Sequence, residues 1–84
     1  VGIGESRSNM RLGLRPNPTS EEVRFRSPVN GEYHIFNRVG GLVQQGSVRK
    51  GEVFLNVGTL RSGVYLLEVS DAMWIQREPL VITR

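Results

Sequence analysis

Cysteine is absent from this 84-residue chain, and histidine and tryptophan each occur once. Without cysteine the chain can hold neither a disulfide framework nor a thiolate metal site, so a domain of this size must rely on its hydrophobic core alone. No apolar run approaches the roughly 18 residues that a membrane-spanning helix needs. These absences exclude toxin-like scaffolds and zinc ribbons.

Residues that could carry catalysis are also scarce. His34 is the only histidine, so a Ser-His-Asp arrangement has one candidate base, and a Cys-His arrangement has no nucleophile. The acidic residues fall in expected turns or at outward positions, where they form no general acid and base pair. We expect no enzymatic activity, no cofactor, no metal and no small-molecule substrate, and we interpret His34 as a partly exposed strand residue.

The charge is positive but dispersed along the chain. Eleven basic residues, ten of them arginine, stand against eight acids and give a formal net charge of +3. Proteins that bind nucleic acids usually gather such charge on one face, whereas these arginines alternate with glutamates along the whole sequence. We therefore expect a solvated surface and no nucleic-acid partner, while the arginine excess leaves an anionic partner such as a phosphate-rich glycolipid open.

The chain divides near residue 12. Residues 1–11 are rich in Gly, Ser and charge without a sustained period, which is typical of a flexible linker. From Val23 onward apolar residues recur with a period of two, and turn signals follow every 8 to 12 or so residues. Asn30-Gly31 is the dipeptide expected of a tight hairpin. The pattern predicts a small all-β sandwich or barrel over residues 12–84, with no helix.

Prolines mark both borders of this pattern. Pro16 and Pro18 fix their own φ and disfavour helix in the residues before them, so the chain enters the first strand extended or turned. Pro79 cannot donate to a sheet ladder, and we expect it to interrupt the last strand, which should lie at a sheet edge or carry a bulge there. Such an edge is open to another chain, so an edge-strand dimer is one expected assembly.

Four segments, taken in order, resemble a known family. They are Pro16-Asn17-Pro18-Thr19, "YHIFNRVGGLV" from Tyr33, "LRSGVYLLEV" from Leu60, and the terminal "LVITR" from Leu80. Together they are similar to the C-terminal sorting domain, type A, of proteins exported by the type IX (Por) secretion system of Bacteroidota. The resemblance implies an immunoglobulin-like antiparallel β-sandwich of about seven strands.

The resemblance also implies a secretion signal rather than a catalyst. A domain of this kind is recognised by an outer-membrane translocon and its shuttle protein while the cargo is in transit through the periplasm. A sortase-like cysteine peptidase then commonly removes the domain and couples the cargo to an anionic lipopolysaccharide, so the cargo ends at the cell surface or outside the cell. Residues 1–11 would hold or adjoin the cleavage point.

The residues that carry the motif have structural interpretations as well. Tyr65 is expected to point inward with its hydroxyl on a backbone group, and Gly63 is expected to release the chain from a turn. The last five residues can close the core or add a strand to a partner's sheet. The motif positions are Pro16, Asn17, Pro18, Gly40, Gly41, Leu60, Gly63, Val64, Tyr65, Leu80, Val81, Ile82, Thr83 and Arg84.

A second function remains open on the sequence alone. Small β-sandwiches appended to secreted enzymes often bind carbohydrate or mediate adhesion, and they usually do so through an exposed aromatic platform. The candidates for such a platform are Phe36, Phe54 and Trp74, which fall on three different expected segments.

Overall fold

The computed structural model describes residues 12–84, and these form six β-strands and no helix. The expected linker at residues 1–11, with its cleavage region, lies outside the described residues. No helix in the described part is long and apolar enough to cross a membrane. The strands are β1 (Glu22–Ser27), β2 (Gly31–Phe36), β3 (Leu42–Val48), β4 (Gly51–Asn56), β5 (Gly63–Ser70) and β6 (Ile75–Ile82).

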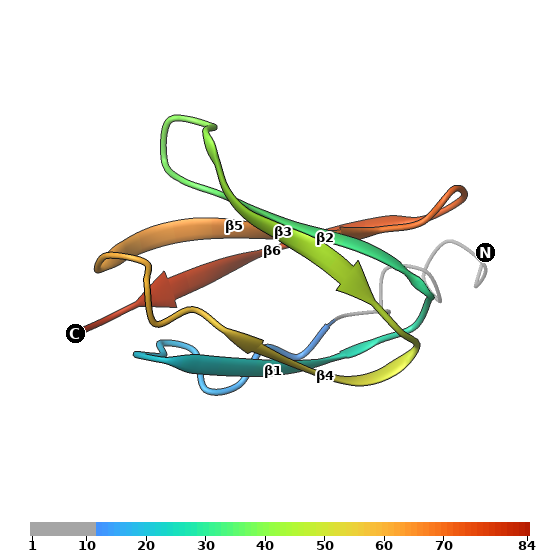
Figure 1. Ribbon diagram of the computed structural model, residues 1–84, viewed down its shortest axis with the longest axis horizontal. Helices are drawn as coiled ribbons and strands as arrows, with labels where there is room; N and C mark the ends of the chain where they lie inside the picture. Colours follow the sequence, from blue (N-terminus) through green and yellow to red (C-terminus); the bar gives the residue numbers. More distant parts are fainter. Residues whose placement is uncertain (1–11) are drawn as a thin grey trace, which may run out of the picture.

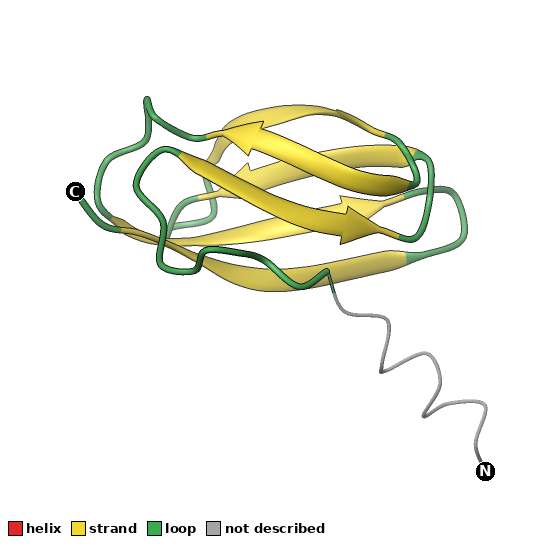
Figure 2. Ribbon diagram, turned by 90° about the horizontal axis from the view of Figure 1, so that it is seen from below, coloured by secondary structure: helices red, strands yellow, loops and turns green. Residues whose placement is uncertain are grey.

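The strands form two antiparallel sheets that face each other (Figures 1 and 2). One sheet pairs β1 with β4, and the other has the order β3-β2-β5-β6. The predicted all-β sandwich is confirmed and is consistent with an immunoglobulin-like arrangement. The structure has six strands where about seven were expected, because the residues before β1 pair through isolated bridges rather than as a full strand.

The core lies between the sheets and follows the period of two. Val23 and Phe25 of β1 point inward, as do Ile35 of β2, Leu67 of β5 and Leu80 of β6, and all five are fully buried. Each such side chain stabilises the fold by roughly 1.5–3 kcal/mol relative to exposure. The period of two predicted from Val23 onward is therefore confirmed in β1, β2 and β5.

The hairpin expected at Asn30-Gly31 is wrong. β1 and β2 belong to different sheets, so the residues between them cross from one layer to the other. Gly31 serves this crossing by close approach rather than by a positive φ, because a Cβ added there would lie 2.0 Å from the carbonyl oxygen of Ser70. The side chain of Asn30 accepts a hydrogen bond from the amide of Lys50 at 2.8 Å. It therefore joins the β1–β2 connection to the β3–β4 connection.

Residues 12–19, called the closing segment below, cover one edge of each sheet. Arg15 exchanges two backbone hydrogen bonds with Arg24 on the outer edge of β1, and the Leu12 carbonyl accepts one from the Arg26 amide. Thr19 pairs with the outer edge of β6, through bonds from its amide to Val81 and from Thr83 to its carbonyl. The closing segment therefore seals one side of the sandwich, and the peptide bonds before its two prolines are cis.

The last strand lies at an edge, as predicted from Pro79. Pro79 does not interrupt β6, however, because its missing N–H falls on the outer side of the strand, away from β5. There the Asn17 amide donates to the Pro79 carbonyl at 3.0 Å and accepts from the Val81 amide at 3.0 Å. The expectation of an edge open to another chain is therefore wrong for the half from Pro79 to Thr83.

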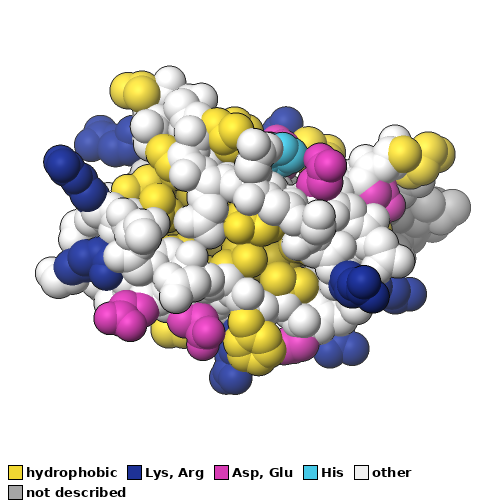
Figure 3. Space-filling model, viewed as in Figure 1, with side chains coloured by type: hydrophobic (Ala, Val, Ile, Leu, Met, Phe, Trp, Pro, Cys, Tyr) yellow, Lys and Arg dark blue, Asp and Glu magenta, His cyan; other side chains and the backbone are white. Residues whose placement is uncertain are grey.

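The opposite side of the sandwich is less closed. There the outer edges of β3 and β4 lie next to each other, and the Gln44 side chain bridges them by donating to the hydroxyl of Tyr33 and the carbonyl of Asn56. Figure 3 shows hydrophobic atoms at the bottom of the hollow between these two strands. This side leaves part of the core visible from outside.

Candidate recognition surface

Most of the motif residues gather at one end of the sandwich. This end, called the motif end below, consists of the β2–β3 loop (37–41), the β4–β5 turn (57–62), the beginning of β5 and residues 82–84 (Figure 1). The register of β5 against β6 brings Gly63 opposite Ile82 and Val64 opposite Val81. Pro16, Asn17 and Pro18 lie alongside β6 in the closing segment. Three motif segments thus meet at the motif end, and the fourth flanks it.

The β2–β3 loop is organised by Asn37. Its side-chain oxygen accepts hydrogen bonds from the amides of Val39 at 3.1 Å and Gly41 at 2.8 Å. Gly40 adopts a φ of 87°, which a residue with a Cβ rarely does. The two glycines therefore form a turn that holds Val39 at the tip of the loop.

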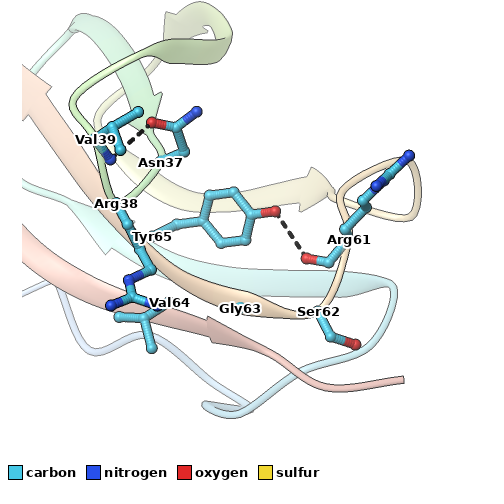
Figure 4. A pocket seen from close by; sticks show the side chains of 8 residues that line it. All are labelled: Asn37, Arg38, Val39, Arg61, Ser62, Gly63, Val64 and Tyr65. Carbon is cyan, nitrogen blue, oxygen red and sulfur yellow. Dashed lines mark hydrogen bonds between the residues drawn. The ribbon is translucent and has the colours of Figure 1, made fainter.

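Tyr65 joins the beginning of β5 to the β4–β5 turn. Its ring packs partly buried against the core, and its hydroxyl donates to the carbonyl of Arg61 at 2.7 Å (Figure 4). Leu60, next to Arg61 in the same turn, is buried in the core. The predicted inward anchor with a backbone hydrogen bond is confirmed.

The last five residues close the core. Leu80 and Ile82 are buried, and Arg84 folds back onto the β4–β5 turn. The Arg84 guanidinium donates to the carbonyls of Leu60 at 2.8 Å and Val57 at 2.9 Å, and its backbone amide donates to Ser62. Sequence reasoning missed this contact, because no local pattern connects the last residue to carbonyls that lie 24 and 27 positions earlier in the chain.

A hollow of about 320 Å³ separates the β2–β3 loop from the β4–β5 turn. Its walls combine the apolar side chains of Val39 and Val64 with the cationic side chains of Arg38 and Arg61, and Figure 4 shows the two arginines on opposite sides of the Tyr65 ring. The complete lining holds no carboxylate and no histidine: Asn37, Arg38, Val39, Arg61, Ser62, Gly63, Val64 and Tyr65. The hollow is suited to contact with an anionic or apolar group rather than to acid and base chemistry.

An apolar strip continues from this hollow along the outer face of the larger sheet. Phe36, Leu66 and Pro79 stand in one row across three strands, and Val64 and Val81 stand in the next. A shallow groove of about 800 Å³ follows this strip. The strip gives the motif end a neutral, partly exposed side surface.

A charged row borders the strip on its far side from the motif end. Glu68 accepts a hydrogen bond from Arg77 at 2.8 Å, and His34 lies beside it with 3.9 Å between Nδ1 and the nearer carboxylate oxygen. The His34 ring stacks on Phe36, and its side chain is partly exposed. This agrees with our interpretation of His34, and residues 12–84 contain no group of three His, Asp or Glu placed to hold a metal.

The aromatic candidates for a carbohydrate platform lie apart. Phe36 is on the larger sheet, Phe54 is on the smaller one, and Trp74 packs partly buried against the core in the β5–β6 turn. A sugar-binding platform needs neighbouring exposed rings. The described residues do not bring these three rings onto one surface.

Comparison with known proteins gives one family. Residues 14–83 match the family model described as "Secretion system C-terminal sorting domain". No curated protein and no solved structure matches significantly. The matched range includes all six strands and most of the closing segment, so the likeness covers the whole sandwich and not one motif.

Proposed function

Because this chain belongs to the family of type IX secretion C-terminal sorting domains, we propose that the outer-membrane translocon and its shuttle protein read residues 12–84 in their folded form. The family membership makes the chain a sorting signal that interacts with the secretion machinery and directs an attached protein toward the cell surface or the extracellular space. Recognition of the folded form is the part that we propose, and the positions of the motif segments in the structure support it.

The convergence of the motif segments carries this proposal. Asn17 and Val81 are hydrogen-bonded across 64 positions of sequence, and Tyr65, Leu60 and Arg84 meet through the carbonyls of the β4–β5 turn. An unfolded chain presents these segments separately and in no fixed geometry. A partner that contacts the motif end therefore distinguishes the folded domain from a linear peptide.

The buried position of Leu12 is suited to removal of the domain by a cut ahead of that residue. We propose that the attached protein passes through the periplasm, and that a sortase-like cysteine peptidase cuts within residues 1–11 before the cargo is coupled to an anionic lipopolysaccharide. Leu12 is fully buried, and its amide donates to Glu78 at 2.7 Å. A cut ahead of Leu12 therefore releases the cargo without opening the core.

A reporter fusion tests the proposal in a bacterium that has the type IX system. A fluorescent protein followed by residues 1–84 is expected at the cell surface or in the medium. Deletion of residues 80–84 should retain it in the periplasm, but this deletion also removes Leu80 and Ile82 from the core. A substitution that leaves the core intact is therefore needed to separate recognition from folding.

Val64 and Ile75 form a matched pair for this purpose. Both side chains are on the outer face of the larger sheet, with 51% and 47% of their surface exposed, but only Val64 lies at the motif end. We expect Val64→Asp to lower the surface reporter at least about tenfold, as loss of a central interface contact does, and Ile75→Asp to leave it unchanged. Equal losses from two folded variants contradict recognition at the motif end, and a folded parent domain that stays periplasmic contradicts the sorting function itself.

A further inference from the structure

Two loop tips expose an apolar side chain almost completely. Val39 at the tip of the β2–β3 loop is 91% exposed, and Met73 in the β5–β6 turn is 92% exposed. The two tips stand at opposite ends of the sandwich (Figure 1). Isolated exposed apolar residues are common on protein surfaces, so the surroundings of each tip decide what it can do.

The surroundings of the two tips differ in charge. Arg38 and Arg61 flank Val39, and both are exposed and form no salt bridge with another described residue. Arg84 also lies at the motif end, where its guanidinium binds two carbonyls of the β4–β5 turn. Met73, in contrast, donates its amide to the carboxylate of Asp71 at 2.8 Å.

The acids at the motif end belong to the other layer. Glu21 and Glu22 stand at the beginning of β1, opposite Asn56, whereas Val39 and Arg38 project from the larger sheet. Figure 3 shows basic side chains close to the projecting loop and acidic ones below them, over the smaller sheet. The projecting part of the motif end therefore combines an apolar tip with unneutralised arginines.

We propose, beyond the sorting function, that the motif end binds membrane surfaces rich in anionic phosphate headgroups. Val39 inserts into the headgroup layer, and Arg38 and Arg61 bind phosphate oxygens from either side of the hollow between the two loops. The planar guanidinium suits this role because it donates two parallel hydrogen bonds to one phosphate. Apolar contact and attraction to anionic lipids act together in such interfacial binding.

The combination favours a membrane over an acidic polypeptide. A soluble acidic segment neutralises the arginines but leaves Val39 in water, because Val39 stands at the convex tip of a loop. A lipid surface takes up the tip and the cations in one step. The strip that begins at Val64 lies beside Arg38 (Figure 4) and gives the inserted loop an apolar flank.

Vesicle sedimentation with the whole chain of residues 1–84 tests this binding. The vesicles contain either phosphatidylcholine alone or phosphatidylcholine with phosphatidylglycerol, and we expect binding only to the anionic ones. Each arginine near such a surface contributes about fivefold to binding at moderate salt, so the double variant Arg38→Gln with Arg61→Gln should bind roughly 25-fold more weakly. The charge-matched variant Arg49→Gln with Lys50→Gln, at the opposite end, should bind within about twofold of the parent.

The apolar tips provide a second matched pair at constant charge. Val39→Ser should weaken binding about fivefold, because a partly inserted side chain loses its transfer free energy, while Met73→Ser should have no effect. Trp74 is the only tryptophan and lies near Met73, so its emission should not change when vesicles are added. The tryptophan emission of Val39→Trp in a Trp74→Phe background should instead shift to shorter wavelength when vesicles are added.

Several results would overturn this assignment. They are equal loss from the two charge pairs, binding to phosphatidylcholine alone that matches the anionic vesicles, and a blue shift of Trp74 in the parent chain. Stronger binding to soluble polyglutamate than to anionic vesicles would assign the arginines to an acidic protein. None of these measurements uses the secretion machinery, so they do not depend on the outcome of the reporter experiment.

Discussion

Gly31 and Gly46 are required because neighbouring atoms leave no room for a Cβ, and not because a turn needs a positive φ. Gly31 stands where β2 begins, with the carbonyl of Ser70 on the neighbouring strand in the place of a side chain. Gly46 stands on β3 opposite Tyr33, whose ring fills the space above it. Both positions therefore restrict side-chain size, but one neighbour is backbone and the other is a movable ring.

This difference predicts unequal costs for two alanine substitutions. In Gly31→Ala the new Cβ meets a main-chain oxygen at 2.0 Å, so two strands must separate. In Gly46→Ala it meets the Tyr33 ring at 2.7 Å, which can tilt. We expect the free energy of unfolding in urea to fall by about 3 kcal/mol for Gly31→Ala and about 1 kcal/mol for Gly46→Ala. Equal midpoints for the two variants would show that backbone approach at Gly31 is not limiting.

At the residue scale the sequence predicts faces well and contacts poorly. The alternation of apolar residues places Ile35, Leu67 and Tyr65 on the inner face because side-chain direction depends only on local period. Asn30-Gly31 fits a hairpin equally well in sequence terms, and its actual role depends on Ser70, which no local pattern connects to it. Arg84 is similar, since its partners are carbonyls in a distant turn.

The outer edge of β6 is protected by an element that is not itself a strand. Natural sheets commonly cover or charge their edges, because unpaired backbone groups invite other chains. Here the closing segment covers the half from Pro79 to Thr83, with the Asn17 side chain in place of a backbone ladder across the proline. The Pro-Asn-Pro sequence thus provides hydrogen-bond partners for this edge through the Asn17 side chain. The backbone of a regular strand could not do so with two prolines, because proline has no N–H.

Asn17→Ala tests this protection. The variant loses two hydrogen bonds and leaves the Val81 amide without its partner, so the free energy of unfolding should fall by about 2 kcal/mol. Asn30→Ala, which loses the single bond to Lys50, is the control and should cost about 1 kcal/mol. Amide hydrogen exchange offers a local measurement, because only Asn17→Ala should accelerate exchange at Val81. Unchanged exchange there would mean that the side chain does not hold the edge.

At the scale of the whole molecule, the closing segment is the part that unites the two sheets. It contributes Leu12 to the core and backbone hydrogen bonds to both β1 and β6. The domain has few other connections of this kind, since the two sheets otherwise meet through side-chain packing and the crossings. We therefore propose that the folding unit begins at residue 12.

Two truncations test the boundary. A chain of residues 12–84 should keep the melting temperature of the 84-residue chain within a few degrees, because it keeps every described contact. A chain of residues 20–84 loses the burial of Leu12, worth roughly 2–3 kcal/mol, and the backbone bonds to both edges. The stabilising free energy lost in this truncation is comparable to the whole free energy of unfolding of a domain this small. Circular dichroism should therefore show no cooperative melting of the 20–84 chain. A 20–84 chain that melts like the parent would contradict the boundary.

Sheet order explains why the architecture was only partly predictable. Strand count and period indicate a sandwich, but they do not determine that β2 pairs with β5 or that residues before β1 reach β6. Those pairings join distant segments, and local propensity does not encode them. The family resemblance identified the motif residues in order, and their meeting at the motif end required the structure.

The parallel pairing between Thr19 and Ile82 has a mechanical consequence. When one side is pulled through residue 12 and the other through residue 84, the closing segment and β6 are drawn in opposite directions along their common axis. The bonds of Asn17 and Thr19 to Pro79, Val81 and Thr83 then bear the load simultaneously in shear, whereas a hairpin pulled at its open end breaks its bonds one at a time. Force that reaches the domain through residue 12 is therefore resisted by bonds that must break together, so the folded domain keeps its shape under load.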